Sequence, residues 1–401
     1  MIINRVGCPV RGDDFYGRDA FIRMVREKLE AGHVLLVSPR RFGKTSVMYR
    51  LIDEPWEDFV LVHADLEHLV EPADLIALLV VQLAKDARLS KTATGLSYFP
   101  KPLWSRFRET FEEIDLLKLR IKLREKLRTR WQEDGEELFE RVAAAPHQVI
   151  FILDEFPMMI DRMAQSDAGR QEAKIMLRWL RKLRQSPDLK NVRFLVAGSI
   201  GIGQVLNALG EIASINDFEQ LWLEPFPQEV AMAFLDELAR THKLPLSRPS
   251  KRKMLELIGT AVPYFVQIIF SEVAKAHMQD GRAMTPGRVE QLYREKVLGV
   301  DCKTYFDHYY GRLRNHGPQD EKALKRLLRE LAVTGWLTRD ACYQLYRQET
   351  RSRGEMEKFN CLMSFLENDF YVRFDAVTRR YEFASKLLRD WWLRHYGMET
   401  K

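Results

Sequence analysis

The residues best suited to chemistry lie between positions 38 and 46, where the chain reads Ser38-Pro39-Arg40-Arg41-Phe42-Gly43-Lys44-Thr45-Ser46. A loop at the start of a helix can surround phosphate groups with backbone N–H donors. Gly43 allows the backbone to approach closely, Lys44 can reach the β- and γ-phosphates, and the Thr45 hydroxyl can ligate Mg²⁺. The first glycine usual in such loops is Ser38 here, so the pattern differs at one position. The segment predicts a nucleotide-binding loop formed by residues 38–46.

Two carboxylates, Asp154 and Glu155, follow the apolar run 149–153. Such a run is typical of a buried parallel strand, which delivers its last residues to the edge of the sheet where ligands bind. We expect Asp154 to hold Mg²⁺, directly or through water, and Glu155 to polarise an attacking water. The alternative is that both acids are simply solvated after the strand. The predicted phosphate loop favours the metal-binding interpretation over this alternative.

A third candidate is Ser199, which follows the apolar run 192–197 and Gly198. At the end of a strand it could sense a γ-phosphate, or it could simply cap a helix or turn. Gly198, Gly201 and Gly203 resemble a second phosphate loop, but no lysine follows them. We therefore interpret these glycines as a flexible turn.

Five short apolar runs predict the strands that position these candidates. They cover residues 34–37, 59–64, 149–153, 192–197 and 220–223. Helical patterns at 20–31, 44–52, 75–84 and 171–184 lie between them. This alternation indicates an α/β fold, a three-layer core around a parallel five-stranded sheet.

A long charged interval, residues 86–145, is expected to form an insertion. Residues 117–124 alternate between apolar and basic, which favours a half-exposed strand at a sheet edge or in a hairpin. The window 118–130 holds seven Lys or Arg against one Glu. This basic run is either a solvated face or a surface that contacts phosphates.

The second half of the chain is predicted to be mostly helical. Helices at 230–241, 251–258, 264–277 and 286–296 indicate a helical lid. Helices at 321–333, 339–347 and 355–369, a hairpin of 371–374 with 380–383, and a last helix at 385–396 indicate a winged helix.

In DNA-binding winged helices the third helix reads the major groove. This third helix offers little base-reading chemistry, so Arg379 and Arg380 in the wing are better candidates for contacts to the phosphates of duplex DNA. Packing of the wing against its neighbours is the alternative.

The composition sets wider limits on the chain of 401 residues. It is 46% hydrophobic and 30% charged, and its net charge of +6 permits an acidic partner without requiring one. Four scattered cysteines argue for a reducing compartment and against a zinc site. The N-terminus lacks an apolar signal region, and the longest uncharged run, 194–210, is short and rich in glycine. We expect a soluble, cytoplasmic protein with no membrane partner.

The order of these parts resembles the AAA+/STAND group of P-loop ATPases, and in particular its prokaryotic archaeal-ATPase branch, which is similar in layout to origin-binding initiators. The matching pieces are Gly17-Arg18, Pro39-Arg40-Arg41-Phe42-Gly43-Lys44-Thr45, Leu153-Asp154-Glu155-Phe156-Pro157, Ala197-Gly198-Ser199, the junction 259–263 and Leu387-Leu388-Arg389-Asp390-Trp391-Trp392.

This resemblance implies an ATPase core at 1–225, a lid at 226–300 and a winged-helix domain at 301–401. It implies that the phosphate-loop strand lies beside the strand that ends in Asp154. It also implies that ATP with Mg²⁺ is the ligand, that Gly17 and Arg18 lie near the adenine, and that Pro263 contributes to the nucleotide site.

One departure from the resembled group concerns the arginine finger, which is usually found between the fourth and fifth strands. Residues 194–239 contain neither Arg nor Lys. The charge would have to come from Arg40 or Arg41 in the same chain, or from Arg178 or Arg181 of a neighbour. Because loss of such a finger lowers turnover by roughly 10³–10⁵ in related enzymes, we expect slow hydrolysis.

Three functions remain open from the sequence. The first is an ATP-dependent switch that recruits a protein partner or assembles into a homo-oligomer. The second is an initiator-like or transposition-like ATPase that binds DNA through the winged helix, and the third is a nucleotide-binding module without turnover. Glu155 argues against the third, since a site without hydrolysis does not need an acid that polarises water.

Overall fold

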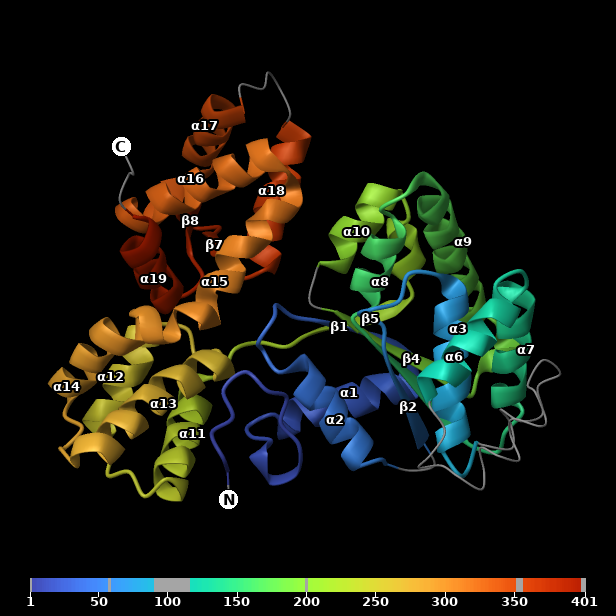
Figure 1. Ribbon diagram of the computed structural model, residues 1–401, viewed down its shortest axis with the longest axis horizontal. Coiled ribbons are helices and arrows are strands. Elements are labelled where there is room, and N and C mark those ends of the chain that lie inside the picture. The colour runs from blue at the N-terminus through green and yellow to red at the C-terminus, as the bar shows by residue number, and fades with distance from the viewer. Residues whose placement is uncertain (1, 57–58, 90–115, 199–200, 351–355, 398–401) are drawn as a thin grey trace. The chain divides into compact units, whose positions relative to one another are not determined.

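The computed structural model describes residues 2–56, 59–89, 116–198, 201–350 and 356–397, with the backbone alone at 116–119. Internal contacts divide the chain into two units (Figure 1). The sheet unit comprises Arg18–Ser38 and Lys44–Leu223. The C-terminal unit comprises Met1–Gly17, Pro39–Gly43 and Glu224–Lys401. The middle of the predicted phosphate loop thus belongs, by its contacts, to the C-terminal unit.

Five parallel strands form the sheet of the sheet unit, in the order β2-β3-β4-β1-β5. They are β1 (His33–Val37), β2 (Phe59–Asp65), β3 (Gln148–Asp154), β4 (Val192–Gly198) and β5 (Phe218–Trp222). The parallel sheet is confirmed, and β5 begins two residues before the predicted strand. The expectation that the phosphate-loop strand lies beside the Asp154 strand is wrong, because β4 pairs with both β1 and β3. Each crossover connection selects a spatial neighbour by packing, which chain order does not reveal.

Helices cover both faces of this sheet (Figure 1). On one face lie α1 (Asp19–Ala31) and α2 (Lys44–Asp53). On the other lie α3 (Pro72–Lys85), α7 (Trp131–Ala143), α8 (Phe156–Met163) and α9 (Asp167–Arg184). The short elements α10 (Ile202–Leu209), η2 (Pro187–Leu189) and η3 (Ile212–Ile215) also belong to the sheet unit, whereas the 3-10 turn η1 (Gly12–Asp14) belongs to the C-terminal unit.

An aromatic cluster fills the space between the sheet and helices α7 and α9. The ring of Phe139 lies 5.1 Å from Phe151 and 5.6 Å from Phe194, and all three rings are fully buried. Each such side chain contributes roughly 1.5–3 kcal/mol by its removal from water. A Cβ at Gly135 would lie 2.6 Å from the ring of Trp179, so this glycine lets α7 approach α9 closely.

Residues 116–127 form a helix, α6 (Leu116–Leu127), and the predicted exposed strand is wrong. Leu123 and Leu127 are fully buried, and α6 packs on the continuous apolar helix α3. Leu, Lys and Arg are strong helix formers, and tertiary packing against α3 overrides the alternating pattern. Arg128 donates to Glu71 at 2.9 Å, so this cation of the basic run is already paired.

The C-terminal unit contains the predicted helices and hairpin. Its first helices are α11 (Gln228–Thr241), α12 (Arg248–Ile258), α13 (Pro263–Asp280) and α14 (Pro286–Leu292), followed by a π-helical turn η4 (Tyr293–Val297) and a 3-10 turn η5 (Val300–Cys302). Then come α15 (Lys303–Arg312), η6 (Leu313–His316), α16 (Pro318–Thr334), α17 (Arg339–Thr350), α18 (Met356–Asn368) and α19 (Lys386–Tyr396).

Three antiparallel strands lie among the last helices, in the order β6-β8-β7. They are β6 (Trp336–Thr338), β7 (Val372–Asp375) and β8 (Arg380–Phe383). The sequence predicted the β7–β8 hairpin but not β6, which has only three residues between two helices. Trp391 and Trp392 of α19 are fully buried and anchor this helix in the unit.

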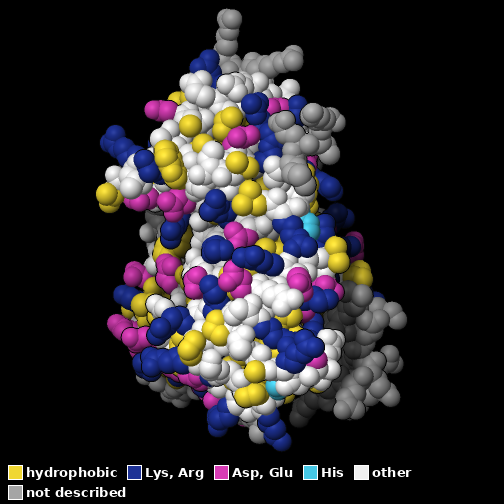
Figure 2. Space-filling model, turned by 90° about the vertical axis from the view of Figure 1, so that its left-hand side faces the viewer, with side chains coloured by type: hydrophobic (Ala, Val, Ile, Leu, Met, Phe, Trp, Pro, Cys, Tyr) yellow, Lys and Arg dark blue, Asp and Glu magenta, His cyan; other side chains and the backbone are white. Residues whose placement is uncertain are grey.

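The surface charges are mixed on the face that Figure 2 shows, where Lys and Arg side chains are interspersed with Asp and Glu. In the C-terminal unit Lys251 pairs with Asp236 at 2.6 Å, and Lys303 pairs with Asp307 at 2.7 Å. Much of its basic charge is therefore compensated locally. Among the described residues, no helix combines the length and apolarity that crossing a bilayer requires.

Candidate phosphate-binding site

The loop between β1 and α2 runs from Ser38 to Gly43. Arg41 has a φ of 70° and Gly43 a φ of 99°, both in the region that side chains disfavour. Apart from its two chain neighbours, no residue that the structure describes has an atom within 4 Å of the position a Cβ would take at Gly43. The conformation of the backbone, rather than lack of space, is what requires glycine here.

Lys44 begins α2 and is almost buried, with 7% of its surface exposed. Its Nζ donates to the carbonyl oxygen of Ser38 at 2.6 Å, across the mouth of the loop. The N-terminus of α2 adds the N–H groups and the partial positive charge of a helix start. A cation and a helix N-terminus are thus held at one place, where a phosphate would find both.

Thr45 of α2 and Asp154 of β3 meet although β1, the strand that precedes α2, is not a neighbour of β3. The Thr45 hydroxyl donates to Oδ2 of Asp154 at 3.3 Å, and the N–H of Glu155 donates to Oδ1 at 2.9 Å. Asp154 ends β3, opposite Asp65 of β2, and is 5% exposed. A hydroxyl and a carboxylate are hard oxygen donors of the kind Mg²⁺ takes, usually with waters and phosphates as its other ligands. The donor set therefore fits the predicted metal.

Burial and, to a lesser extent, the negative charge of Glu155 raise the pKa of Asp154 from its ordinary 3.8 to about 6, while the Lys44 ammonium acts in the opposite direction. A desolvated carboxylate beside a second acid lacks positive charge. Cation binding at this point would supply it, which makes Asp154 a candidate functional group and not only a strand end.

Glu155 joins β3 to α8 in a left-handed conformation, with a φ of 55°. This conformation is uncommon for a residue with a side chain, and such outliers gather at functional sites. The close approach of Gly198 to α8 is the feature that sequence reasoning missed: a Cβ there would lie 2.3 Å from Cδ of Pro157. Gly198 ends β4 against the first turn of α8 instead of merely forming a flexible turn. Ser199, the predicted sensor, lies outside the described residues.

The central residues of the loop contact other parts of the C-terminal unit. Nη1 of Arg41 donates to the carbonyl oxygen of Gly7 at 2.7 Å, and its guanidinium lies 4.9 Å from the ring centroid of Tyr264. Phe42 is 3% exposed and its ring packs against Phe370. Sequence reasoning gave neither contact.

The residues that the resemblance places in the nucleotide site outside the loop belong to different elements, namely Gly17, Arg18 and Pro263. Gly17, with a φ of 68°, packs on α11, because a Cβ there would lie 2.6 Å from Val230. Pro263 is the first residue of α13. Arg18 precedes α1 in the sheet unit and is 9% exposed.

The candidate arginines from a neighbouring copy lie on α9. Arg178 donates from Nε to Glu211 at 2.9 Å, which already neutralises its charge. Arg181 and Lys182 line an open hollow beside this pair.

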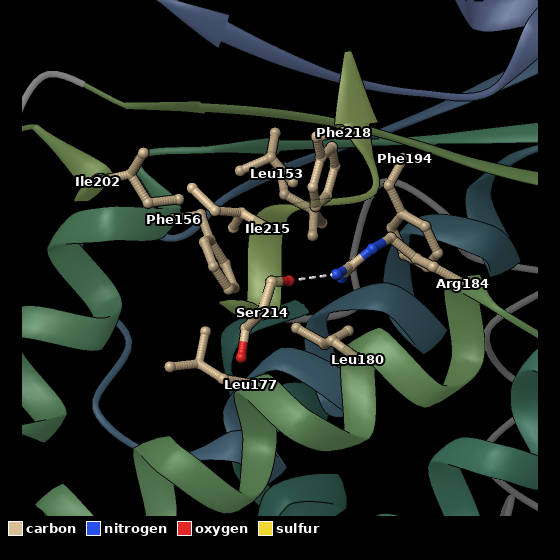
Figure 3. A pocket seen from close by; sticks show the side chains of 11 residues that line it. Leu153, Phe156, Leu177, Leu180, Arg184, Phe194, Ile202, Ser214, Ile215 and Phe218 are labelled. Carbon is tan, nitrogen blue, oxygen red and sulfur yellow. Dashed lines mark hydrogen bonds between the residues drawn. The ribbon is translucent and has the colours of Figure 1, made fainter. Parts of the chain in front are cut away.

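A closed pocket beneath the sheet is shown in Figure 3. Its volume is about 10 Å³ and its walls are almost entirely apolar, including Phe156, Leu180 and Phe218. Arg184 closes one side by donating to the carbonyl oxygen of Ser214 at 2.5 Å, and it pairs with Asp217 at 2.7 Å. Ligand pockets have volumes of roughly 300–1,000 Å³, so this void is a packing gap.

The solved structures that are similar to this chain include the following two. A Walker-type ATPase of Pyrococcus abyssi has a TM-score of 0.66 and 17% identity, covering 97% of this chain and 99% of that chain. The ORC2 protein of Aeropyrum pernix, solved in ADPNP–ADP complexes, has a TM-score of 0.50 and 14% identity, covering 93% and 90%. No family model matches the sequence, and the search among curated proteins finds no match. At these identities the likeness shows the fold, and it confirms the predicted α/β class with its parallel five-stranded sheet.

Proposed function

We propose that this chain is an ATP-binding, slowly hydrolysing switch ATPase that uses Mg²⁺ and couples its nucleotide state to recruitment of a protein partner or to assembly. The observation that supports it best is the meeting of Lys44, Thr45 and Asp154 at the N-terminus of α2. The fold shared with a Walker-type ATPase and with a protein solved in ADPNP–ADP complexes agrees with it. The cytoplasmic location remains part of the proposal, because the four cysteines are scattered along the sequence without a paired spacing.

Each residue of the proposed site has a distinct task. The backbone of residues 38–46 binds phosphate oxygens, and Lys44 exchanges its bond to the Ser38 carbonyl for the β- and γ-phosphates. Asp154 and Thr45 would hold Mg²⁺, which when bound neutralises phosphate charge. Glu155 would orient the attacking water and accept its proton.

The remaining predicted residues are assigned by resemblance. Gly17, Arg18 and Pro263 would lie at the base and sugar, and Ser199 would sense the γ-phosphate. Arg41, one proposed finger from the same chain, is already engaged with Gly7 and Tyr264. Arg40 of the same chain and Arg181 of a neighbouring copy remain as candidate sources, and we expect turnover of the isolated chain to stay low.

DNA binding through a C-terminal winged helix is the second candidate. Arg379 supports it, since it sits with a φ of 53° at the exposed turn of the β7–β8 hairpin. The third helix, α18, argues against base reading. Lys358 pairs with Asp320 at 2.9 Å, and Asn360 accepts from Arg339 at 2.7 Å. We therefore favour a protein-directed switch.

Titration of a fluorescent ATP analogue with Mg²⁺ tests nucleotide binding. Lys44→Ala should weaken binding at least tenfold, whereas Lys190→Ala, an exposed lysine outside the site, should leave it unchanged. Glu155→Gln should keep binding and lose hydrolysis. Equal binding by wild type and Lys44→Ala would refute the assignment of the site. If wild type binds nucleotide but does not hydrolyse it, the chain is a nucleotide-binding module and not an ATPase.

A salt series with a generic labelled duplex separates the two candidates. Phosphate contacts make affinity fall steeply with salt. Binding that depends on ATP and is weakened in Arg379→Ala would favour the DNA-binding ATPase. Absence of binding in every nucleotide state would favour the protein-directed switch.

A further inference from the structure

Phe42 is an unusual residue for the middle of a phosphate loop because it is almost fully buried, with 3% of its surface exposed. Its ring centroid lies 4.9 Å from that of Phe370, at an angle of 80°. This edge-to-face arrangement is one that aromatic pairs prefer. The partner comes from the junction between α18 and β7, more than three hundred residues away in the chain.

Both sides of this contact carry backbone strain. In the described part of the chain, the non-glycine residues with positive φ are Arg41, Glu155, Lys243, Phe370 and Arg379. Arg41, beside Phe42, has a φ of 70°, and Phe370 has a φ of 64°. A bulky residue keeps such a conformation only when its surroundings fix it, and such outliers point to function.

The surroundings of Phe370 are rigid. The N–H of Phe370 donates to Glu367, and that of Tyr371 donates to Leu366 at 2.9 Å. The Tyr371 hydroxyl donates to the carbonyl oxygen of Tyr309 at 2.6 Å, and the neighbouring Asp369 is buried in an ion pair with Arg312 at 2.7 Å. Phe370 therefore cannot follow a movement of the loop without a rearrangement of the α18–β7 junction.

Phe370 also begins a continuous aromatic path through the C-terminal unit. Its ring lies 6.5 Å from Phe265 of α13, which lies 6.0 Å from Phe306 of α15. Phe306 in turn lies 5.8 Å from Trp391 of α19. The other rings of this path are fully buried, namely Phe265, Phe306 and Trp391. Because buried side chains are closely packed, a displacement of one ring requires its neighbours to move as well.

We propose that the contact between Phe42 and Phe370 couples the conformation of the phosphate loop to that of the α18–β7 junction. Phe370 thereby transmits the nucleotide state to this junction. The inference rests on the proposed nucleotide site, because Gly43 is joined directly to Lys44. Phosphate binding to the loop reorients the backbone of the loop. The ring of Phe42 therefore keeps its contact with the ring of Phe370 in one nucleotide state and loses it in another. Phe370 acts here as a coupling residue and does not touch the nucleotide.

Hydrogen exchange with and without ATP–Mg²⁺ tests this coupling at the backbone of residues 364–374. Wild type should show altered exchange there on nucleotide addition, and Phe42→Leu and Phe370→Leu should each lose the response. Phe370→Tyr, which keeps the ring, should restore it. Phe374→Leu is the matched control, since Phe374 lies four residues away, is 37% exposed and packs on Tyr381 instead. Its response should equal that of wild type.

Nucleotide affinity measured on the same proteins gives a second readout. Each Leu variant should change the affinity at least threefold, and the double variant should match either single one, because both remove the same contact. If nucleotide binds but Phe42→Leu keeps the exchange response of wild type, the coupling is overturned. The same holds if nucleotide binds to wild type without changing its exchange. Either outcome leaves the proposed function intact. Absence of nucleotide binding in wild type would instead overturn the proposed function and the inference with it.

Discussion

The substitution Asp154→Asn should stabilise the nucleotide-free protein, although it removes a proposed metal ligand. The Asp154 carboxylate is 5% exposed and its pKa is raised from 3.8 to about 6 by burial, with the charge of Glu155 adding to the effect. At pH 8 the group is ionised in both the folded and the unfolded chain, and its charge is less favourable in the folded one.

The magnitude follows from the shift in pKa. A shift of about two units corresponds to about 3 kcal/mol of lost stability at pH 8, at 1.36 kcal/mol per unit. Because the folded pKa is the higher one, the folded chain holds the proton more tightly. This favourable contribution is complete below pH 3.8 and is lost as the pH rises through about 6. Asparagine carries no charge, so the variant should not lose this free energy of unfolding at pH 8. Its gain is reduced by weaker hydrogen bonds from Thr45 and from the N–H of Glu155 to the amide.

Urea unfolding of both proteins in EDTA, at pH 5 and pH 8, measures this effect. The variant should exceed wild type at pH 8, and its advantage should shrink by about 1 kcal/mol at pH 5, where wild type is mostly protonated. In excess Mg²⁺ and ATP the order should reverse, because ligand binding stabilises only the wild-type site. A variant less stable than wild type at pH 8 in EDTA would refute the reasoning, since it would mean that the carboxylate is satisfied without a cation.

Two further predictions concern the frame of the site. Gly198→Ala would place a Cβ 2.3 Å from Pro157, and should cost about 1–3 kcal/mol in urea unfolding through overpacking. Gly203→Ala, inside α10 and with no atom closer than 4.0 Å, should be neutral or stabilising, and equal losses in both would contradict the packing argument. Burial lowers the pKa of His33 from 6.5 to about 4, so its contribution is complete above pH 6.5 and is lost as the pH falls toward 4. His33→Gln should therefore lose less stability than wild type between pH 7 and pH 5, and identical losses would show that His33 is not the group that titrates.

The sequence by itself determined the local parts of the site. An apolar run predicted β1 and β3 because a buried parallel strand must be apolar on both faces. Gly43 followed by Lys44 and Thr45 predicted a phosphate loop because these types supply backbone freedom, a cation and a hydroxyl within one turn. Asp154 was found from its place at the end of a strand. The strand predictions are confirmed because they depend on neighbours in the chain, whereas the phosphate loop and the role of Asp154 stay predictions.

Tertiary structure alone decided which elements lie side by side. The strand β4 separates β1 from β3, and the segment Leu116–Leu127 is a helix in spite of its alternating pattern, since packing on α3 outweighs it. The fit of Gly198 to Pro157 and of Phe42 to Phe370 also joins residues distant in sequence. Such contacts depend on shape complementarity between separate elements, which no local pattern of residue types encodes.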